Sequence, residues 1–407
     1  MKVEVMEILC LGIVFLVIVV ILWMKKPLFA AIAGGIVATI LLFRVPLGEA
    51  VGVLARQSVA ADTIDVLLSF YFVTFLQKML ERRNRLRAAQ QSFDCLLRNR
   101  RLNAALSSAV LGLLPSAAVM TVCADMVDQT CGDYLDKKEK MVVSCYYRHI
   151  PEMFLPTFSS VLLALTLSGV SAGPFVFSMI PIVLVACLLP YLVYLRKVPA
   201  GMPPLEREIS KKAEVLSLLK NLWSLIAVVV IIIVFDLSVC VATPLVIAVN
   251  YFVDHFRAQE IPGLLKESAE PILLGNMYLI MLFKGIITHT GVVALLPDFF
   301  GQFPIPIAAA FALIFFFGSV ISGAQAIIAL CLPMAMTAIP EGGLPLLVML
   351  MCIAWAANQI SPTHVCTFVA ARFYGTTLGD LVVRATPIVV AFSVLSYGYA
   401  MLLGIFF

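Results

Sequence analysis

Apolar runs of membrane-spanning length recur along the whole chain, and they constrain its fold more than any other feature. The first run extends from Ile8 to Trp23, and a helix of about 20 apolar residues crosses the ~30 Å hydrocarbon layer of a bilayer. Of the 407 residues, 62% are hydrophobic and 13% are charged, whereas soluble domains carry about 25% charged residues. This composition excludes a soluble globular protein and predicts an all-α polytopic membrane protein.

The same length rule predicts about ten spans. Lys25 and Lys26 follow the first run without a small-residue cleavage pattern, so we expect a retained span rather than a cleaved signal peptide. The ten cysteines form no CxxC pair, so neither disulfides nor thiolate metal sites are expected. The predicted spans are residues 7–24, 27–44, 64–80, 141–168, 174–195, 221–236, 239–254, 270–289, 344–372 and 380–406.

Two apolar segments, residues 102–128 and 305–339, are interrupted at their centres by small or helix-breaking residues such as Gly112, Pro115 and Gly323. Each half is too short to cross a bilayer by itself. Irregular backbone is tolerated at membrane depth only where it lines a cavity within the protein. We therefore predict two re-entrant hairpins that enter and leave on the same side.

The distribution of charge predicts the orientation. Threading these spans gathers basic residues of the segments 82–101, 137–140 and 196–220 on one face, and leaves Asp236 and Glu341 on the other. Basic loops face the cytoplasm, so we expect a protein of the cytoplasmic membrane with both termini outside. A net charge of +4 is too small to indicate a nucleic-acid partner.

The two halves of the chain resemble each other at a fixed offset of 206 residues. Each copy contains an odd number of predicted spans, so the second copy enters the membrane upside down. Such inverted repeats with interrupted helices are typical of secondary transporters, whose site lies between the repeats. We predict one repeat in residues 1–199, a cytoplasmic linker in 200–220 and a second repeat in 221–407. The matched pairs include Lys78 and Lys284, Gly112 and Gly318, Ser116 and Ser322, Pro156 and Pro362, Thr157 and Thr363, and Gly169 and Gly375.

The matched interruptions are the candidate site. Broken helices offer free carbonyl groups to cations and N–H groups to anions, although such residues can also serve only to kink and pack helices. We expect Glu152 to act in ion coupling, with an ion pair to Arg148 as the alternative, and Pro156 and Pro362 to free carbonyls for a sodium ion. The candidate substrate-binding residues are Ser116, Ala117, Thr157, Ser159, Ser322, Gly323, Gln325, Asn358, Ser361, Thr363 and His364.

Two short motifs resemble those of the ion-transporter superfamily, which includes arsenite, citrate and dicarboxylate transporters. They are Leu114-Pro115-Ser116, which leads to Asp125-Met126-Val127-Asp128, and the segment from Ile360 to Cys366. Within that superfamily the sequence is most similar to the membrane family called domain of unknown function 401. The resemblance implies a scaffold domain, a mobile transport domain with two hairpins, an elevator mechanism and a homodimer.

On these grounds we predict a symporter for a small anionic organic solute, coupled to sodium or protons, with membrane lipid as its surroundings. The alternative is a sodium/proton antiporter in which Glu152 is essential. An intramembrane enzyme is disfavoured because HExxH, P-loop and GxSxG motifs are absent, and no cofactor beyond sodium is expected. We assign residues 7–44, 174–195 and 221–254 to the scaffold, 64–168 and 270–372 to the transport domain, and 49–63 and 255–269 to connecting arms.

Overall fold

The computed structural model describes residues 2–24, 26–113, 117–201, 210–300, 302 and 304–406. Within these residues the regular structure is helical, and β-structure is limited to one bridge between Asn99 and Gly201. Seven of the described helices are long and apolar enough to cross a membrane. The chain is therefore a multi-pass helical membrane protein. These seven are Met6–Trp23, Ala61–Arg82, Ala172–Val193, Lys211–Phe235, Pro271–His289, Pro340–Asn358 and Leu378–Ile405.

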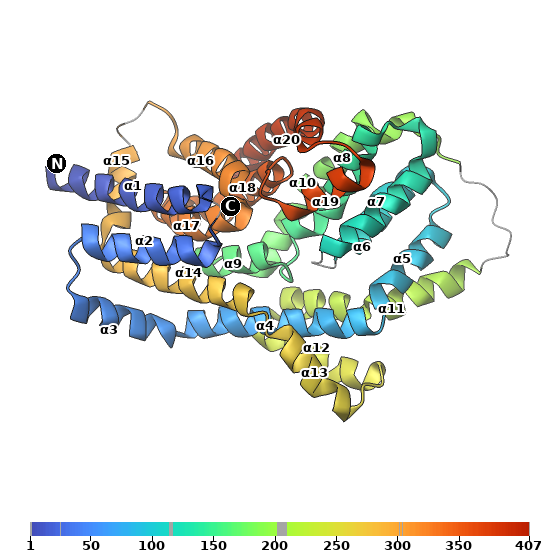
Figure 1. Cartoon of the computed structure of the whole chain (residues 1–407), viewed down its shortest axis with the longest axis horizontal. Helices are drawn as coiled ribbons and strands as arrows, with labels where there is room; N and C mark the ends of the chain where they lie inside the picture. The colour runs from blue at the N-terminus through green and yellow to red at the C-terminus, as the bar shows by residue number, and fades with distance from the viewer. Residues whose placement is uncertain are drawn as a thin grey trace.

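Figure 1 shows the helices in chain order. Their bounds are α1 Lys2–Trp23, α2 Leu28–Leu42, α3 Leu47–Ser58, α4 Ala61–Arg82, α5 Arg85–Leu96, α6 Arg100–Leu111, α7 Ala117–Cys131, α8 Lys137–Arg148, α9 Ser159–Ser168, α10 Ala172–Val193, α11 Lys211–Phe235, α12 Val239–Val253, α13 Ile261–Ser268, α14 Pro271–His289, α15 Leu296–Phe300, α16 Ile307–Ser322, α17 Ala324–Ala338, α18 Gly343–Asn358, α19 Val365–Tyr374 and α20 Leu378–Phe406.

The helix boundaries follow the predicted interruptions. The predicted span 141–168 is divided between α8 and α9, and the predicted span 344–372 is divided between α18 and α19. The two predicted hairpins correspond to α6 with α7 and to α16 with α17. Six of the other predicted spans coincide with long apolar helices, while 27–44 and 239–254 contain the shorter apolar helices α2 and α12.

Equivalent helices recur at the offset seen in the sequence. Helices α9 and α19 each contain ten residues, and both of their bounds are 206 residues apart. Each ends at a glycine in the left-handed region, Gly169 at φ +70° and Gly375 at φ +64°. Glycine adopts this conformation without the strain that a Cβ atom brings. The same backbone signal therefore terminates both helices.

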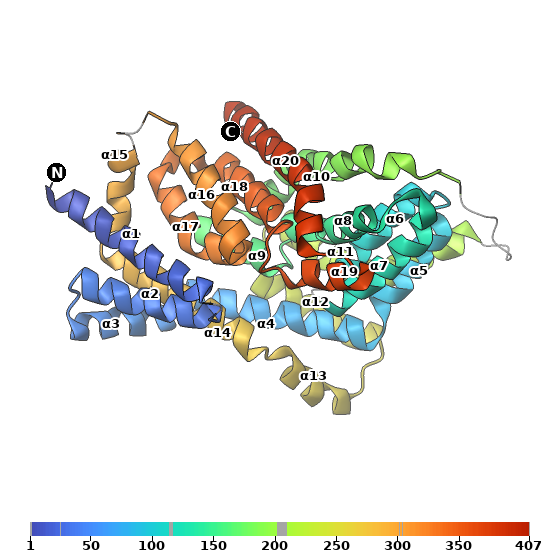
Figure 2. The ribbon, with the colours of Figure 1, turned by 45° about the horizontal axis from the view of Figure 1, so that its top comes forward.

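The contacts between the two halves of the chain come in matching couples. Helix α2 packs on α14 and α12 packs on α4, while α3 packs on α14 and α13 packs on α4. Helix α7 packs on α19, and α17 packs on α9. In Figure 2, α6–α8 and α16–α18 accordingly lie on opposite sides of the region that contains α9 and α19. Each half is thus packed into the other rather than standing beside it.

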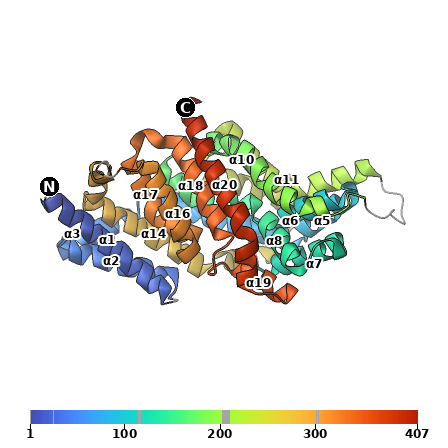
Figure 3. The same ribbon diagram turned by 90° about the horizontal axis from the view of Figure 1, so that it is seen from above.

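The long helices α10 and α20 are joined by two reciprocal hydrogen bonds. The Tyr194 hydroxyl donates to the carbonyl oxygen of Arg384 at 2.7 Å. The Tyr399 hydroxyl donates to the carbonyl oxygen of Ser178, also at 2.7 Å. Ser178 and Arg384 are 206 residues apart, and the two tyrosines are equivalent to within one residue. The two helices contact each other along the face shown in Figure 3.

Helix α18 lies at the centre of the protein. Every residue from Leu346 to Ala357 is buried, as expected for a helix that is apolar on all sides. It packs against α16, α17 and α20, and its last residue, Asn358, ends at the second interruption. A helix buried on all sides therefore holds one side of the candidate site.

Candidate functional site

Proline residues accompany both interruptions in the helices. Helix α8 ends at Arg148, a short 3-10 turn follows over Ile150–Met153, and α9 begins at Ser159 after Pro156. Helix α18 ends at Asn358, and α19 begins at Val365 after Pro362. Because proline lacks a backbone N–H and its ring clashes with the preceding turn, neither α-helix continues through these segments.

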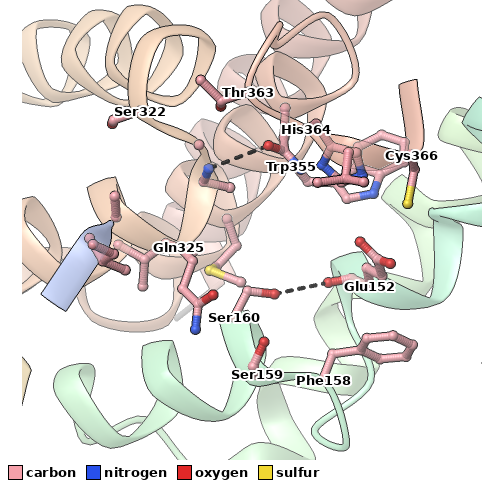
Figure 4. A pocket seen from close by; sticks show the side chains of 18 of the residues that line it. Glu152, Phe158, Ser159, Ser160, Ser322, Gln325, Trp355, Thr363, His364 and Cys366 are labelled. Carbon is pink, nitrogen blue, oxygen red and sulfur yellow. Dashed lines mark hydrogen bonds between the residues drawn. The ribbon is translucent and has the colours of Figure 1, made fainter. Parts of the chain in front are cut away.

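The two interruptions and the second hairpin enclose a cavity of about 480 Å³. In Figure 4, Ser322 and Gln325 come from the hairpin, Glu152, Ser159 and Ser160 from the first broken helix, and Thr363, His364 and Cys366 from the second. A cavity of this volume is typical of small-molecule sites. Four smaller cavities also occur among the described residues.

Eight of the candidate residues line this cavity. Thr157 faces a smaller neighbouring cavity of about 210 Å³ between α4 and α9. Pro156 is buried and Pro362 is exposed, but neither lines the main cavity. Ser116 lies outside the described residues, and Ala117 is the first residue of α7. The eight are Glu152, Ser159, Ser322, Gly323, Gln325, Asn358, Thr363 and His364.

Ser361 connects the second interruption to the hairpin instead of facing the cavity. Its hydroxyl donates to the carbonyl oxygen of Val320 in α16 at 2.7 Å and contacts the Thr363 hydroxyl at 2.8 Å. Asn358 also contacts the hairpin, since its Oδ1 accepts a long hydrogen bond of 3.5 Å from the Ala324 N–H. The position of the hairpin tip thus depends on the polar residues of the second interruption.

The first interruption contains an ion pair. Arg148 Nη1 lies 2.9 Å from Glu152 Oε1, four residues along the chain. The Arg148 side chain is 1% exposed and that of Glu152 is 21% exposed. A buried guanidinium needs such a partner because an unpaired charge in a low-dielectric interior is costly. The two formal charges cancel, so this pair gives the cavity no net charge.

Three helix N-termini open onto the cavity. Helix α9 begins at Ser159, α17 at Ala324 and α19 at Val365, and all three residues line the cavity wall. None of the three N-cap residues caps its own helix with a side chain, and the Ala324 N–H of α17 makes a long hydrogen bond to Asn358 Oδ1. The first N–H groups of a helix have no partner within it, and the helix dipole places partial positive charge there. Together these ends favour a negatively charged ligand.

Several side chains at the site were not selected from the sequence. Ser160, Trp355 and Cys366 line the cavity, as does Arg148, which the sequence indicated only as the ion-pair partner of Glu152. His149 Nε2 lies 2.9 Å from His364 Nε2. The Trp355 Nε1–H donates to the carbonyl oxygen of His149 at 2.7 Å across the two halves. The offset of 206 residues pairs His149 with Trp355, and this was the one signal that could have indicated their contact.

The model of a family described as "Protein of unknown function (DUF401)" matches residues 8–402. The fold is similar to that of the YdaH transporter of Alcanivorax borkumensis, with a TM-score of 0.53 and 13% identity over 87% of this chain and 86% of that chain. Neisseria gonorrhoeae MtrF, whose structure illuminates a class of antimetabolite efflux pumps, has a TM-score of 0.45 and 12% identity over 87% and 83% of the two chains. No curated protein matches the sequence.

Proposed function

The chain belongs to the DUF401 family of proteins of unknown function, and we propose that it is a secondary active transporter for a small anionic organic solute in the cytoplasmic membrane. The observation that carries this proposal is the convergence of three helix N-termini on one cavity. The likeness of the fold to a membrane transporter supports it.

The transport proposal includes an inverted repeat. It is supported by the common 206-residue offset of α9 and α19 and by the reciprocal packing of α7 on α19 and α17 on α9. In transporters built this way, two related halves alternate in exposing one central site to the two sides of the membrane. We place both termini outside, as the basic segments 82–101 and 196–220 favour the cytoplasm.

We propose an elevator motion within a homodimer, with one change to the domain assignment made from the sequence. Helices α4 and α14 pack against α12, α13, α2 and α3, so we group them with the scaffold rather than with the transport domain. The hairpins and broken helices pack mainly on one another and form the proposed mobile unit. Helices α3 and α13 are amphipathic and are the proposed arms.

We favour sodium coupling over proton coupling. The Arg148–Glu152 ion pair engages the carboxylate in a structural contact with the buried guanidinium. Carbonyl groups released near Pro156 and Pro362 are oxygen ligands of the kind that hard cations prefer. The sodium/proton antiporter remains the second candidate, because Glu152 lines the cavity and is partly exposed to it.

The coupling ion is tested with Glu152→Gln in liposomes under separately imposed sodium and proton gradients. We expect sodium-driven solute uptake to persist, since glutamine retains an acceptor for Arg148. If the unsubstituted protein takes up solute in response to a proton gradient but not to a sodium gradient, sodium coupling is overturned. Proton exchange for sodium without any organic solute would support the antiporter.

The solute site is tested by screening carboxylates and other organic anions in the same liposomes. Ser322→Leu fills the cavity wall at the hairpin and should abolish uptake of the solute found. Thr337→Leu is the matched control, because Thr337 is an exposed residue of α17 that does not line the cavity. Equal loss in both variants, or transport of cationic solutes only, would contradict the proposal.

A further inference from the structure

Two histidines and a cysteine from different segments converge beside the cavity. One ligand atom from each of His149, His364 and Cys366 lies within 4.8 Å of the other two. His149 is fully buried behind the cavity, whereas His364 and Cys366 line its wall. The first interruption supplies one member of this cluster, and the second supplies the other two. The cluster therefore bridges the two broken helices.

The hydrogen bonds of His149 direct the lone pair of its Nε2 toward His364 and the centre of the cluster. His149 Nδ1 lies 2.6 Å from the carbonyl oxygen of Cys145. A carbonyl only accepts, so Nδ1 carries the proton and Nε2 keeps its lone pair. That Nε2 faces the Nε2 of His364 at 2.9 Å. An imidazole held through its other N–H by a backbone carbonyl is the usual arrangement of a metal-binding histidine.

We propose that His149, His364 and Cys366 bind a soft transition-metal cation of the Zn²⁺ class, with its fourth coordination position open to the cavity. Two imidazole nitrogens and a thiolate suit zinc and exclude the hard cations sodium, magnesium and calcium. Zn–N bonds of about 2.0–2.1 Å at a tetrahedral angle separate two nitrogens by about 3.3 Å. A small side-chain rotation from the observed 2.9 Å separation admits the ion.

Binding rearranges protons without any transfer of electrons. The Cys366 thiol becomes a thiolate and releases its proton to water in the cavity. On His364 the Nε2 proton moves to Nδ1, which lies 2.7 Å from the Asn358 side chain. In the metal-free protein the Asn358 amide points its NH₂ group at His364 Nδ1. Once Nδ1 carries the proton, the amide rotates so that its oxygen accepts a hydrogen bond from Nδ1–H. This rotation takes Asn358 Oδ1 away from the Ala324 N–H at the hairpin tip. Metal binding therefore links the two broken helices and weakens their contact with the hairpin.

The site is tested on the purified, tag-free protein with Co²⁺ and Zn²⁺, independently of any transport assay. We expect one ion per chain after dialysis, measured by elemental analysis, and a thiolate-to-cobalt charge-transfer band that Zn²⁺ displaces. Cys366→Ser should abolish the band, and the matched control Cys240→Ser, in α12, should keep it. A band that survives in Cys366→Ser, or no retained ion in the unsubstituted protein, would overturn the proposal.

Asn358 provides a second test that does not remove a ligand. Asn358→Asp places an acceptor toward His364 Nδ1–H and should tighten Zn²⁺ binding about tenfold or more, as supporting groups of zinc sites do. Asn358→Leu removes the acceptor and should weaken binding. Equal affinities in these two variants would contradict the proposed geometry. Because the measurement uses detergent-solubilised protein, the metal site can fail while the transport proposal stands, and the reverse also holds.

Discussion

The break between α8 and α9 and the break between α18 and α19 differ in chemistry although the helices that follow them have equal length. The first contains the ion pair of Arg148 and Glu152. The second contains uncharged groups, with Ser361 bonded to Val320 and Asn358 in contact with Ala324. Backbone geometry is therefore shared between the halves, while the side chains are specialised. The charged break stabilises itself locally, and the neutral break controls the neighbouring hairpin.

The largest expected effect contrasts Gly112→Ala with Gly318→Ala. A Cβ at Gly112 would lie 1.9 Å from the backbone oxygen of Arg148, whereas one at Gly318 would meet the Ile327 side-chain terminus at 2.4 Å. A backbone carbonyl at the first break cannot move as an isoleucine methyl can. We expect Gly112→Ala to lose about 3 kcal/mol or more of stability through overpacking. Thermal unfolding in detergent measures both variants.

Gly318→Ala should retain a melting temperature near that of the unsubstituted protein, because Ile327 can adopt another rotamer. The control is Gly52→Ala, where a Cβ has no neighbour within 4 Å. Equal destabilisation at positions 112 and 318 would contradict the prediction, because it would show that Ile327 of α17 cannot move away from the added Cβ.

The next effect is that of removing the charge from the first break alone. Arg148→Met leaves Glu152 without its partner, and we expect a loss of about 2 kcal/mol, less than for a fully buried pair because Glu152 is partly exposed. The double variant Arg148→Met, Glu152→Leu should recover much of this loss. A double variant no more stable than Arg148→Met would show that the pair is not the principal role of Arg148.

A smaller effect separates the two threonines at the same repeat position. Thr363 lines the main cavity, whereas Thr157 lines the smaller one. Thr363→Val should lower solute uptake about tenfold, the equivalent of one lost hydrogen bond of about 1.4 kcal/mol. Thr157→Val should lower solute uptake by a smaller factor than Thr363→Val does, and the apparent KM for the solute should follow the same order. The reverse order would place the solute in the smaller cavity.

The smallest effect lies outside the membrane-spanning helices. Arg83 bonds both carboxylate oxygens of Glu260, at 3.0 and 2.9 Å, and its guanidinium also covers the Phe256 ring. The hydrogen bonds from Arg83 lower the pKa of Glu260 below its ordinary 4.5. The pair therefore stabilises the fold at neutral pH and is lost only as the pH falls below that value. Glu260→Gln should hardly change the melting temperature at pH 7.5, and salt should screen the residual effect.

The interruptions could be predicted from the sequence because proline and glycine act locally. Pro156 and Pro362 mark the ends of helical segments, and Gly169 and Gly375 end α9 and α19. Apolar length correctly located six spans, since hydrophobicity is a property of consecutive residues. Apolar length does not indicate which helices pack together. The sequence therefore placed α4 and α14 in the transport domain, whereas their packing on α12, α13, α2 and α3 groups them with the proposed scaffold.

The side-chain cluster at the site could not be predicted in the same way. His149 and Cys366 are separated by more than half the chain, and neither belongs to a recognisable ligand spacing. Ser361 was expected beside the cavity, but its preference for the free carbonyl of Val320 is settled only by the fold. Ser116 lies outside the described residues, so its predicted place near Ser322 stays a prediction.

The two tyrosine bonds between α10 and α20 have a consequence for how such a chain can be divided. Each half gives a phenol to a carbonyl of the other half, so these two contacts do not depend on the peptide link that joins the halves. Residues 1–201 and 210–407, expressed as separate polypeptides, should then assemble into one particle that migrates with the intact chain. Tyr194→Phe or Tyr399→Phe, each of which removes one of these hydroxyl groups, should reduce assembly of the separate halves more than it lowers the stability of the intact chain.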